Sequence, residues 1–343
     1  MSSLPAPRPV RATATYHRVM RRPTRWIVFV ALGVIAGLAI TIYLPWYAVA
    51  PGPARAVQPL IRFDERPRYE SQGSFVMTSV RFTRLTGLGM LLAWLDPDRA
   101  IVAREVLYPD GEDVRQERER AISQMDSSKL DAAAVVMGEL EGYPKEHGEG
   151  VLIESVVPGC AADGELFPGD RILSIDGTKV DTYAAARRAI RAAPSGDTLT
   201  FGLSVDGTPE AARLVREPCG GRKRPLVGVS MIDSFPFDVS ISSGDIGGPS
   251  AGLMWALGLY DLLTPGDLTG GRTIAGTGQI TLDGTVIPID GIQEKIAAAA
   301  DAGATVFLVP EGNLKAAREG GDHGLRLAPV SSFDDALAFL EQP

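Results

Sequence analysis

An uncharged stretch from Trp26 to Ala54 restricts the topologies open to this chain more than any other feature. Its first 19 residues, WIVFVALGVIAGLAITIYL, are mostly apolar and would measure about 28 Å as a helix, close to the hydrocarbon thickness of a bilayer. Aromatic residues of the kind enriched at membrane interfaces stand at both ends: Trp26, Tyr43, Trp46 and Tyr47. The pattern predicts a transmembrane helix over residues 26–48.

Charge is distributed unevenly on the two sides of this stretch. Residues 1–25 contain six arginines and no acidic residue, whereas the rest of the chain has 28 basic and 42 acidic residues, a net charge of −14. The positive-inside rule therefore places residues 1–25 in the cytoplasm as a basic tail, and the body of a single-pass cell-membrane protein outside the cell. An acidic body also argues against nucleic acid as a partner, because phosphate backbones bind basic surfaces.

A cleaved signal peptide is the alternative interpretation of the same stretch. Residues 48–50, AVA, resemble a cleavage site. However, the apolar run is longer than a typical signal-peptide core, and Pro51 would directly follow the cut.

Two cysteines, Cys160 and Cys219, lie in the part expected outside the cell. A disulfide is permitted there, and two buried thiols are the alternative. The chain has no C-x-x-C pair and no cluster of His and Cys, so we expect no structural zinc site.

The region around residues 148–216 has a compact order of strand, turn and helix signals. An apolar strand, GVLIESVV, ends at Pro-Gly, and DTLTFGLSVDGTPEAARLV has the pattern of a hairpin around Asp-Gly. The run PGCAADGELFPGDRILSIDG, residues 158–177, resembles PDZ domains of the bacterial protease-associated kind. We therefore expect a PDZ domain over residues 146–216, after a connecting region at 51–145.

A PDZ domain binds an extended chain end as an added strand. The resemblance places that groove between a strand containing Val151, Leu152 and Ile153 and a helix over residues 183–193. The familiar carboxylate-binding loop is not evident in GYPKEHGEG, which leaves binding of free C-termini open. A PDZ fold that serves only as a spacer is the alternative.

Ser250 lies in the sequence GGPSAG, directly before an apolar run. In one interpretation it is only a first-turn residue of a helix that has Pro249 at its start. In a second it is the nucleophile of a G-x-S-x-G elbow, which needs a histidine base, but only His323 follows it. In the third its base is a lysine, as in Ser–Lys variants of the catalytic triad.

Lys295 is the candidate base. On a helix starting at Gly291 it falls at the flank of an apolar stripe, away from the face of Glu294 and Asp301. A lysine titrates at about 10.4 in water, whereas a general base should titrate at roughly 7–8, a difference of about 3–5 kcal/mol. Nearby acids favour the ammonium, so only burial can supply this shift. The alternative is a lysine whose stem packs on the core while its amine stays in water.

The blocks GGPSAG, TGQITLDGTVIPIDGIQEKIAAA and ATVFLVPEGN resemble the proteolytic domain of the Lon family. The whole arrangement resembles bacterial membrane-anchored PDZ–Lon peptidases. The resemblance implies that Ser250 is the nucleophile, Lys295 its base and Thr277 the partner of the lysine amine. Backbone N–H groups at Gly247, Gly248 and Ser250 would then hold the oxyanion. It also implies an α+β and α/β multidomain fold with a Lon-type domain over residues 225–343.

The chain departs from ATP-dependent Lon in having no G-x-x-x-x-G-K-[ST] motif. We therefore expect a peptidase without cofactors that cleaves unfolded or extended extracytoplasmic proteins without ATP. The resemblance further implies a homo-oligomeric ring, a hexamer. The alternative from another functional class is a catalytically silent PDZ adaptor at the membrane.

Overall fold

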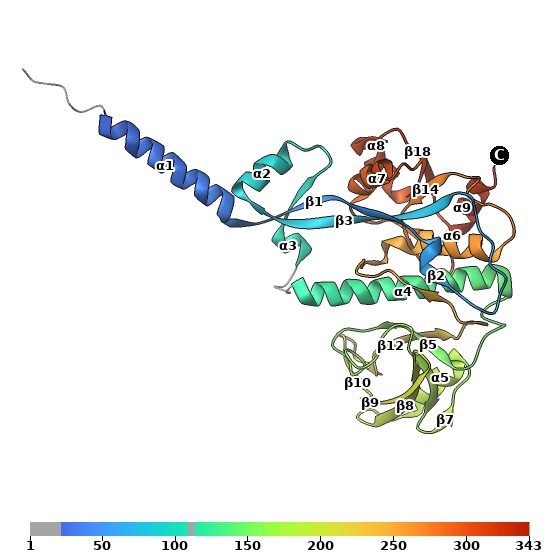
Figure 1. Cartoon of the computed structure of the whole chain (residues 1–343). Helices are drawn as coiled ribbons and strands as arrows, with labels where there is room; N and C mark the ends of the chain where they lie inside the picture. The colour runs from blue at the N-terminus through green and yellow to red at the C-terminus, as the bar shows by residue number, and fades with distance from the viewer. Residues whose placement is uncertain (1–21, 109–113, 343) are drawn as a thin grey trace, which may run out of the picture.

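The computed structural model describes residues 22–108 and 114–342 (Figure 1). Helix α1 (Arg22–Thr41) projects from one end, and two folded units lie on opposite sides of the long helix α4 (Val114–Glu141). The chain enters the larger unit, leaves it to form the smaller one over residues 151–233, and then returns to complete the larger one.

The larger unit is built on a six-stranded sheet of order β18-β17-β14-β3-β1-β4. Strands β3, β14, β17 and β18 are parallel, whereas β1 pairs antiparallel with β3 and β4. The strands are β1 (Tyr43–Ala56), β3 (Ser74–Thr86), β4 (Ala100–Ala103), β14 (Thr273–Gly276), β17 (Val306–Pro310) and β18 (Arg326–Val330). Segments from before and after the smaller unit thus form one sheet.

This sheet changes the expected role of residues 51–145. Residues 74–86 form β3, which lies inside the sheet beside β14 rather than in a connector. Its partner strand, β14, follows the smaller unit in the sequence. A pairing across so long a separation leaves no local trace in the sequence.

Helices cover both faces of the sheet (Figure 1). The first face packs against α4, α6 (Gly252–Leu263) and α9 (Phe333–Leu340), and the second against α7 (Ile292–Asp301) and α8 (Leu314–Gly320). Side chains alternate along β3, so Phe75 and Met77 join the first core and Val76 joins the second. This alternation decides which side chains can face α7.

Short elements complete the larger unit. The stretch QITLDGTVIPI forms a hairpin of β15 and β16, and Ser332 caps α9 by accepting a hydrogen bond from the Asp335 N–H at 3.0 Å. These elements are η1 (Gln58–Leu60), β2 (Ile61–Arg62), α2 (Gly87–Trp94), α3 (Arg104–Leu107), β13 (Ser240–Ile241), β15 (Gln279–Ile280), β16 (Val286–Ile287) and η4 (Glu311–Asn313).

The smaller unit is a sheet of order β12-β5-β6-β8-β9 with β7 beside β6 and one helix, α5. The β8–β9 hairpin turns at Asp206 and Gly207, both with positive φ, as the Asp-Gly pair predicts. The elements are β5 (Val151–Val156), β6 (Arg171–Ile175), β7 (Thr178–Lys179), α5 (Tyr183–Ala192), β8 (Thr198–Val205), β9 (Thr208–Val215) and β12 (Val229–Asp233).

Strand β12 corrects two expectations. It extends the smaller unit beyond residue 216, into the segment that was assigned to the proteolytic domain. It also covers the side of β5 that was expected to be free: Val151, Leu152 and Ile153 pair with Asp233, Ile232 and Met231. With β6 on its other side, β5 has no open edge. The open edge of this sheet next to α5 belongs to β12.

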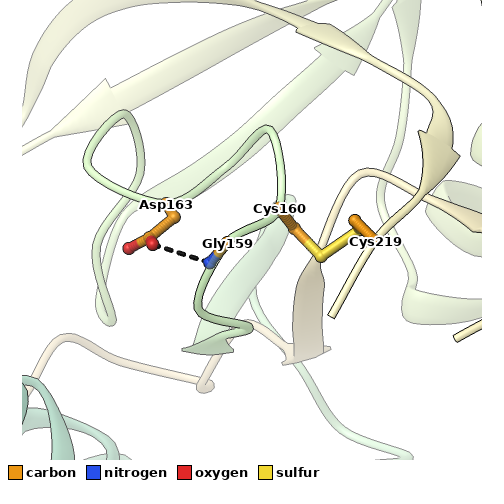
Figure 2. Close-up of a disulfide and its surroundings, with 4 residues drawn as sticks. All are labelled: Gly159, Cys160, Asp163 and Cys219. Atoms are coloured by element: carbon orange, nitrogen blue, oxygen red, sulfur yellow. Dashed lines mark hydrogen bonds between the residues drawn. A yellow bond between two sulfur atoms is a disulfide. The ribbon is translucent and has the colours of Figure 1, made fainter. Parts of the chain in front are cut away.

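Cys160 and Cys219 form a disulfide, the alternative that sequence left open (Figure 2). It joins the loop after β5 to the residue that directly follows β10 (Glu217–Pro218). Strand β10 pairs with β11 (Pro225–Leu226), so residues 219–224 form the turn of a short hairpin. Gly228 packs on this bridge, where a Cβ would lie 2.1 Å from the Cys160 Cβ. The disulfide thus holds the loops that lead the chain into β12.

The N-terminal segment differs from the helix expected over residues 26–48. The helix ends at Thr41, and residues 43–48 pair with β3 and β4 as the first part of β1. Among the described residues, no helix combines the length and the apolar character of a membrane span. The basic tail, residues 1–21, lies outside the described part of the chain.

Candidate active site

Ser250 lies on the short helix η3 (Pro249–Ala251), which leads directly into α6. The two preceding glycines are required by the turn. Gly248 has φ of 90°, and a Cβ on Gly247 would lie 2.8 Å from the Ala121 Cβ of α4. The Ser250 carbonyl accepts a hydrogen bond from the Gly278 N–H at 2.8 Å. The serine is thus clamped between α4 and the segment that follows β14.

Lys295 reaches this serine from α7, on the second face of the sheet. Its Nζ lies 2.6 Å from Ser250 Oγ and 3.0 Å from Thr277 Oγ1. Only 3% of the residue is exposed, so its amine does not extend into water. The prediction that these three side chains meet agrees with this geometry. Glu294, expected on the opposite, polar face of the helix, is also buried.

Burial lowers the pKa of Lys295 to about 8, and the Asp290 carboxylate acts weakly in the opposite direction. Removing an ammonium from water without a counter-ion favours the neutral amine. A substantial fraction of Lys295 is therefore neutral near pH 8. A neutral amine at 2.6 Å can accept the proton of Ser250 Oγ.

Thr277 connects the two catalytic candidates. Its Oγ1 donates a hydrogen bond to the Ser250 carbonyl at 2.9 Å and accepts one from Lys295 Nζ. A hydroxyl can do both at once because it carries one hydrogen and two lone pairs. Thr277 therefore fixes the position of the amine relative to the serine backbone.

The backbone around Ser250 offers fewer free N–H groups than expected. Gly248 donates its N–H to the Ala121 carbonyl of α4 at 2.6 Å, so this group is already used. Among the described residues, the N–H groups of Gly247 and Ser250 have no hydrogen-bond partner. These two remain as the donors available to an oxyanion.

Other polar residues near the motif in sequence lie elsewhere. Asp245 pairs with Arg118 of α4 at 2.8 Å on the surface, and His323 makes its contact with Asp98, at 3.6 Å. His323 is therefore not placed as the base of a nucleophile elbow. Within the described ranges, no group of three or more His, Cys, Asp or Glu residues has the arrangement of a metal site.

Helix α4 supplies two supports that sequence analysis missed. Ala121 accepts the Gly248 N–H, and Ser128 Oγ donates to the Pro249 carbonyl at 2.8 Å. Both residues belong to a charged and Ala-rich stretch with no motif of its own. Only the long-range packing of α4 on η3 brings them to the site.

Comparison with known proteins identifies two domains. Residues 236–340 match the Lon protease (S16) C-terminal proteolytic domain, and residues 152–201 match the PDZ domain. The Lon protease of Rickettsia typhi is 32% identical over 175 residues, covering 48% of this chain and 22% of that protein. The Lon protease of Rickettsia felis is 35% identical over 206 residues, covering 59% of this chain and 22% of that protein.

The PDZ domain of an SdrC-like protein from Listeria monocytogenes is a solved structure similar to this chain. It has 24% identity and a TM-score of 0.23, and the match covers 24% of this chain and 88% of that one. The chain thus carries a Lon-type (S16) serine peptidase domain and a PDZ domain in a mixed α/β, multidomain fold. It spans about a fifth of the length of the two Lon proteases.

Acylation of Ser250 should follow the titration of Lys295. We expect the rate of labelling by a serine-reactive phosphonate to rise through an apparent pKa of about 8. Lys295→Met should slow labelling by at least about a hundredfold. Ser250→Ala is the control for labelling elsewhere. A pH-independent rate, or unchanged labelling in Lys295→Met, would contradict a lysine base.

Lys295→Met should slow acylation but raise the stability of the folded chain. The folded-state pKa of Lys295 lies below its unfolded value, so the cost of burying its charge is fully present at neutral pH. Between about pH 8 and 10 unfolding takes up a proton, and stability rises over that range. Lys295→Met removes this penalty and should raise the unfolding free energy at pH 7 by up to about 3 kcal/mol. Denaturant unfolding at pH 7 and pH 10 measures the difference.

Proposed function

We propose that this chain is an ATP-independent serine endopeptidase that uses Ser250 as nucleophile and Lys295 as general base. The observation that carries the proposal is the 2.6 Å contact between Ser250 Oγ and a buried lysine amine whose pKa lies near 8. The S16 domain match covers both residues. The substrates are unfolded or extended proteins.

In the proposed reaction, Lys295 Nζ takes the hydroxyl proton as Ser250 Oγ attacks the peptide carbonyl carbon. The N–H groups of Gly247 and Ser250 stabilise the resulting oxyanion. Lys295 then returns the proton to the leaving amine, which departs and leaves an ester on Ser250. The neutral Lys295 next deprotonates a water molecule, which hydrolyses the ester and restores the serine.

The proposal that this chain needs no ATP rests on its sequence. The 343 residues contain no G-x-x-x-x-G-K-[ST] motif for binding nucleotide phosphates. The polypeptide must therefore reach Ser250 without unfolding work from this chain. The hexameric ring implied by the family resemblance stays a prediction.

The PDZ domain is proposed to select substrates at the free edge of β12. This strand is the last in its sheet, so an extended polypeptide can pair with it beside α5. Next to this edge is a cavity of about 630 Å³. It is lined by Tyr183 of α5, Met231 and Asp233 of β12, parts of α4, and the β15–β16 turn of the proteolytic domain. A chain bound at β12 would therefore lie close to the proteolytic domain.

A membrane location is proposed from the N-terminal helices. Apolar side chains of α1 are exposed on all sides. The end of α2 and its C-cap residue continue this surface with Leu92, Trp94 and Leu95, which are 56%, 74% and 65% exposed. The two helices touch, since a Cβ on Gly87 would lie 3.3 Å from the Ala39 carbonyl oxygen. Burying such a surface in lipid is favourable. The disulfide favours placing both domains in an oxidising, extracytoplasmic compartment.

The peptidase proposal predicts cleavage of an unfolded polypeptide by the full chain in detergent, without nucleotide. Ser250→Ala and Lys295→Met should each abolish cleavage, and ATP with Mg²⁺ should leave the wild-type rate unchanged. Fragment release is followed by gel electrophoresis and mass spectrometry. A folded but inert wild type would instead favour the adaptor alternative, and stimulation by ATP would contradict nucleotide independence.

If substrates bind at β12, a change in the cavity should affect long polypeptide substrates but not short peptides. Tyr183→Ala removes one wall of the cavity and should raise KM for an unfolded polypeptide several-fold, without affecting kcat for a short chromogenic peptide that does not reach β12. Arg213→Ala, an exposed change on β9 at the opposite edge of the same sheet, is the matched control. Equal KM values for Tyr183→Ala and wild type would argue against binding at β12.

Membrane attachment predicts that the full chain sediments with membranes and resists extraction by high salt. Ile35→Arg in α1 combined with Leu92→Glu in α2 should shift it to the soluble fraction, because each buries a charge in lipid. Leu282→Glu, a similar change at an exposed leucine of the proteolytic domain, is the control. An extractable wild type would refute attachment through α1 and α2.

A further inference from the structure

Thr78 on β3 is a buried hydroxyl that the dyad chemistry does not use. The residue is 5% exposed, and its Oγ1 has no hydrogen-bond partner within the described part of the chain. Leaving such a group unpaired is costly, whereas a valine of the same shape would avoid the cost. An unpaired buried hydroxyl at this position therefore suggests a hydrogen bond that is made when the site is active.

The sheet places Thr78 next to Thr277. Strands β3 and β14 are parallel, and Met77 pairs with Gly276, so the next residues of the two chains are neighbours. Side chains alternate along β3, and Val76 faces α7 together with Ala275. Thr78 and Thr277, two residues further, therefore face α7 as well. The contact of Thr277 with Lys295 Nζ agrees with this orientation.

Helix α7 brings Lys295 to the level of Thr78. A Cβ on Gly291 would lie 3.0 Å from Val80 Cγ1, which places the start of α7 over Val80. The helix lies between parallel strands β14 and β17, so it runs opposite to them and to β3. Four residues of helix rise about 6 Å, and two residues of strand about 6.6 Å. Counting back from Val80, Lys295 is level with Thr78.

The Lys295 amine has one more N–H group than Ser250 and Thr277 can accept. When its lone pair points to the Ser250 hydroxyl, a neutral amine still has two N–H groups, and the ammonium formed in acylation has three. Ser250 Oγ and Thr277 Oγ1 are the side-chain oxygens that bond Nζ among the described residues. One N–H is therefore without a partner in both protonation states, and Thr78 Oγ1, on the strand beside Thr277, is without one as well.

We propose that Thr78 is a positioning residue that accepts the remaining N–H of Lys295, either directly after rotation of its side chain or through one water molecule. This inference rests on the proposed Ser–Lys chemistry. With Thr277 and Thr78 holding its two N–H groups, the neutral amine cannot rotate its lone pair away from Ser250 Oγ. The same hydroxyl stabilises the ammonium after proton transfer, because hydrogen bonds to charged donors are the stronger kind.

Thr78→Val tests the proposal because it removes the hydroxyl and keeps the shape. We expect kcat for a short peptide to fall about tenfold with KM unchanged, which corresponds to one hydrogen bond to a charged group. We also expect the apparent pKa of the rate to fall by about one unit, since the ammonium loses an acceptor. Thr78→Ser should restore both values. Ser79→Ala, at a neighbouring residue whose Oγ donates to the Pro53 carbonyl, is the matched control.

Direct titration of the amine separates this proposal from the peptidase function. In full-length chain with 15N-labelled lysine, the Nζ resonance of Lys295 is identified by its absence in Lys295→Met and followed against pH. A lower pKa in Thr78→Val supports the role of Thr78 even if the chain cleaves no tested substrate. An unchanged pKa and pH profile, with only a gain in stability, would show that Thr78 is a structural residue and overturn the proposal.

Discussion

The proposed active site depends on keeping the Lys295 amine out of water. Lys295 can act as a base near neutral pH only because α7 packs against the sheet and buries its side chain. Hydrogen bonds also fix the position of Ser250. Its carbonyl is bound by Gly278 N–H and Thr277 Oγ1, and its turn is bound by α4 through Ala121 and Ser128. Elements from both faces of the sheet thus set one distance of 2.6 Å.

Helix α4 also links this site to the PDZ domain. Ser127 Oγ donates to Glu154 of β5 at 2.7 Å, while Ser128, the next residue, bonds the Pro249 carbonyl. The PDZ domain is inserted between α4 and η3, with a connection to the proteolytic domain at each of its ends. Two connections restrict its motion more than a single flexible linker would. The free edge of β12 and the Ser250 turn are therefore supported by the same helix.

Local patterns predicted much of this structure. The hairpin at Asp206–Gly207, the helix from Gly291 and the meeting of Ser250 with Lys295 follow from turn residues, helical periodicity and the Lon-like motifs. The position of the PDZ groove did not follow, because the edge strand β12 is only five residues long and lies beyond the short β10–β11 hairpin. The bond of Gly248 to Ala121 is likewise invisible in sequence. Pairings between distant segments depend on tertiary packing, which no local pattern encodes.

The chemical character of the groups around Lys295 explains how a lysine can be oriented without being kept charged. A carboxylate in contact with Nζ would bind the amine firmly but stabilise the ammonium and raise its pKa. The groups in contact are the hydroxyls of Ser250 and Thr277, which accept hydrogen bonds without carrying charge. Among the described residues, Asp290 is the acid that raises the pKa of Lys295, and its effect is smaller than that of burial. In an acidic protein, lining the amine with hydroxyls therefore allows an oriented lysine to remain a usable base.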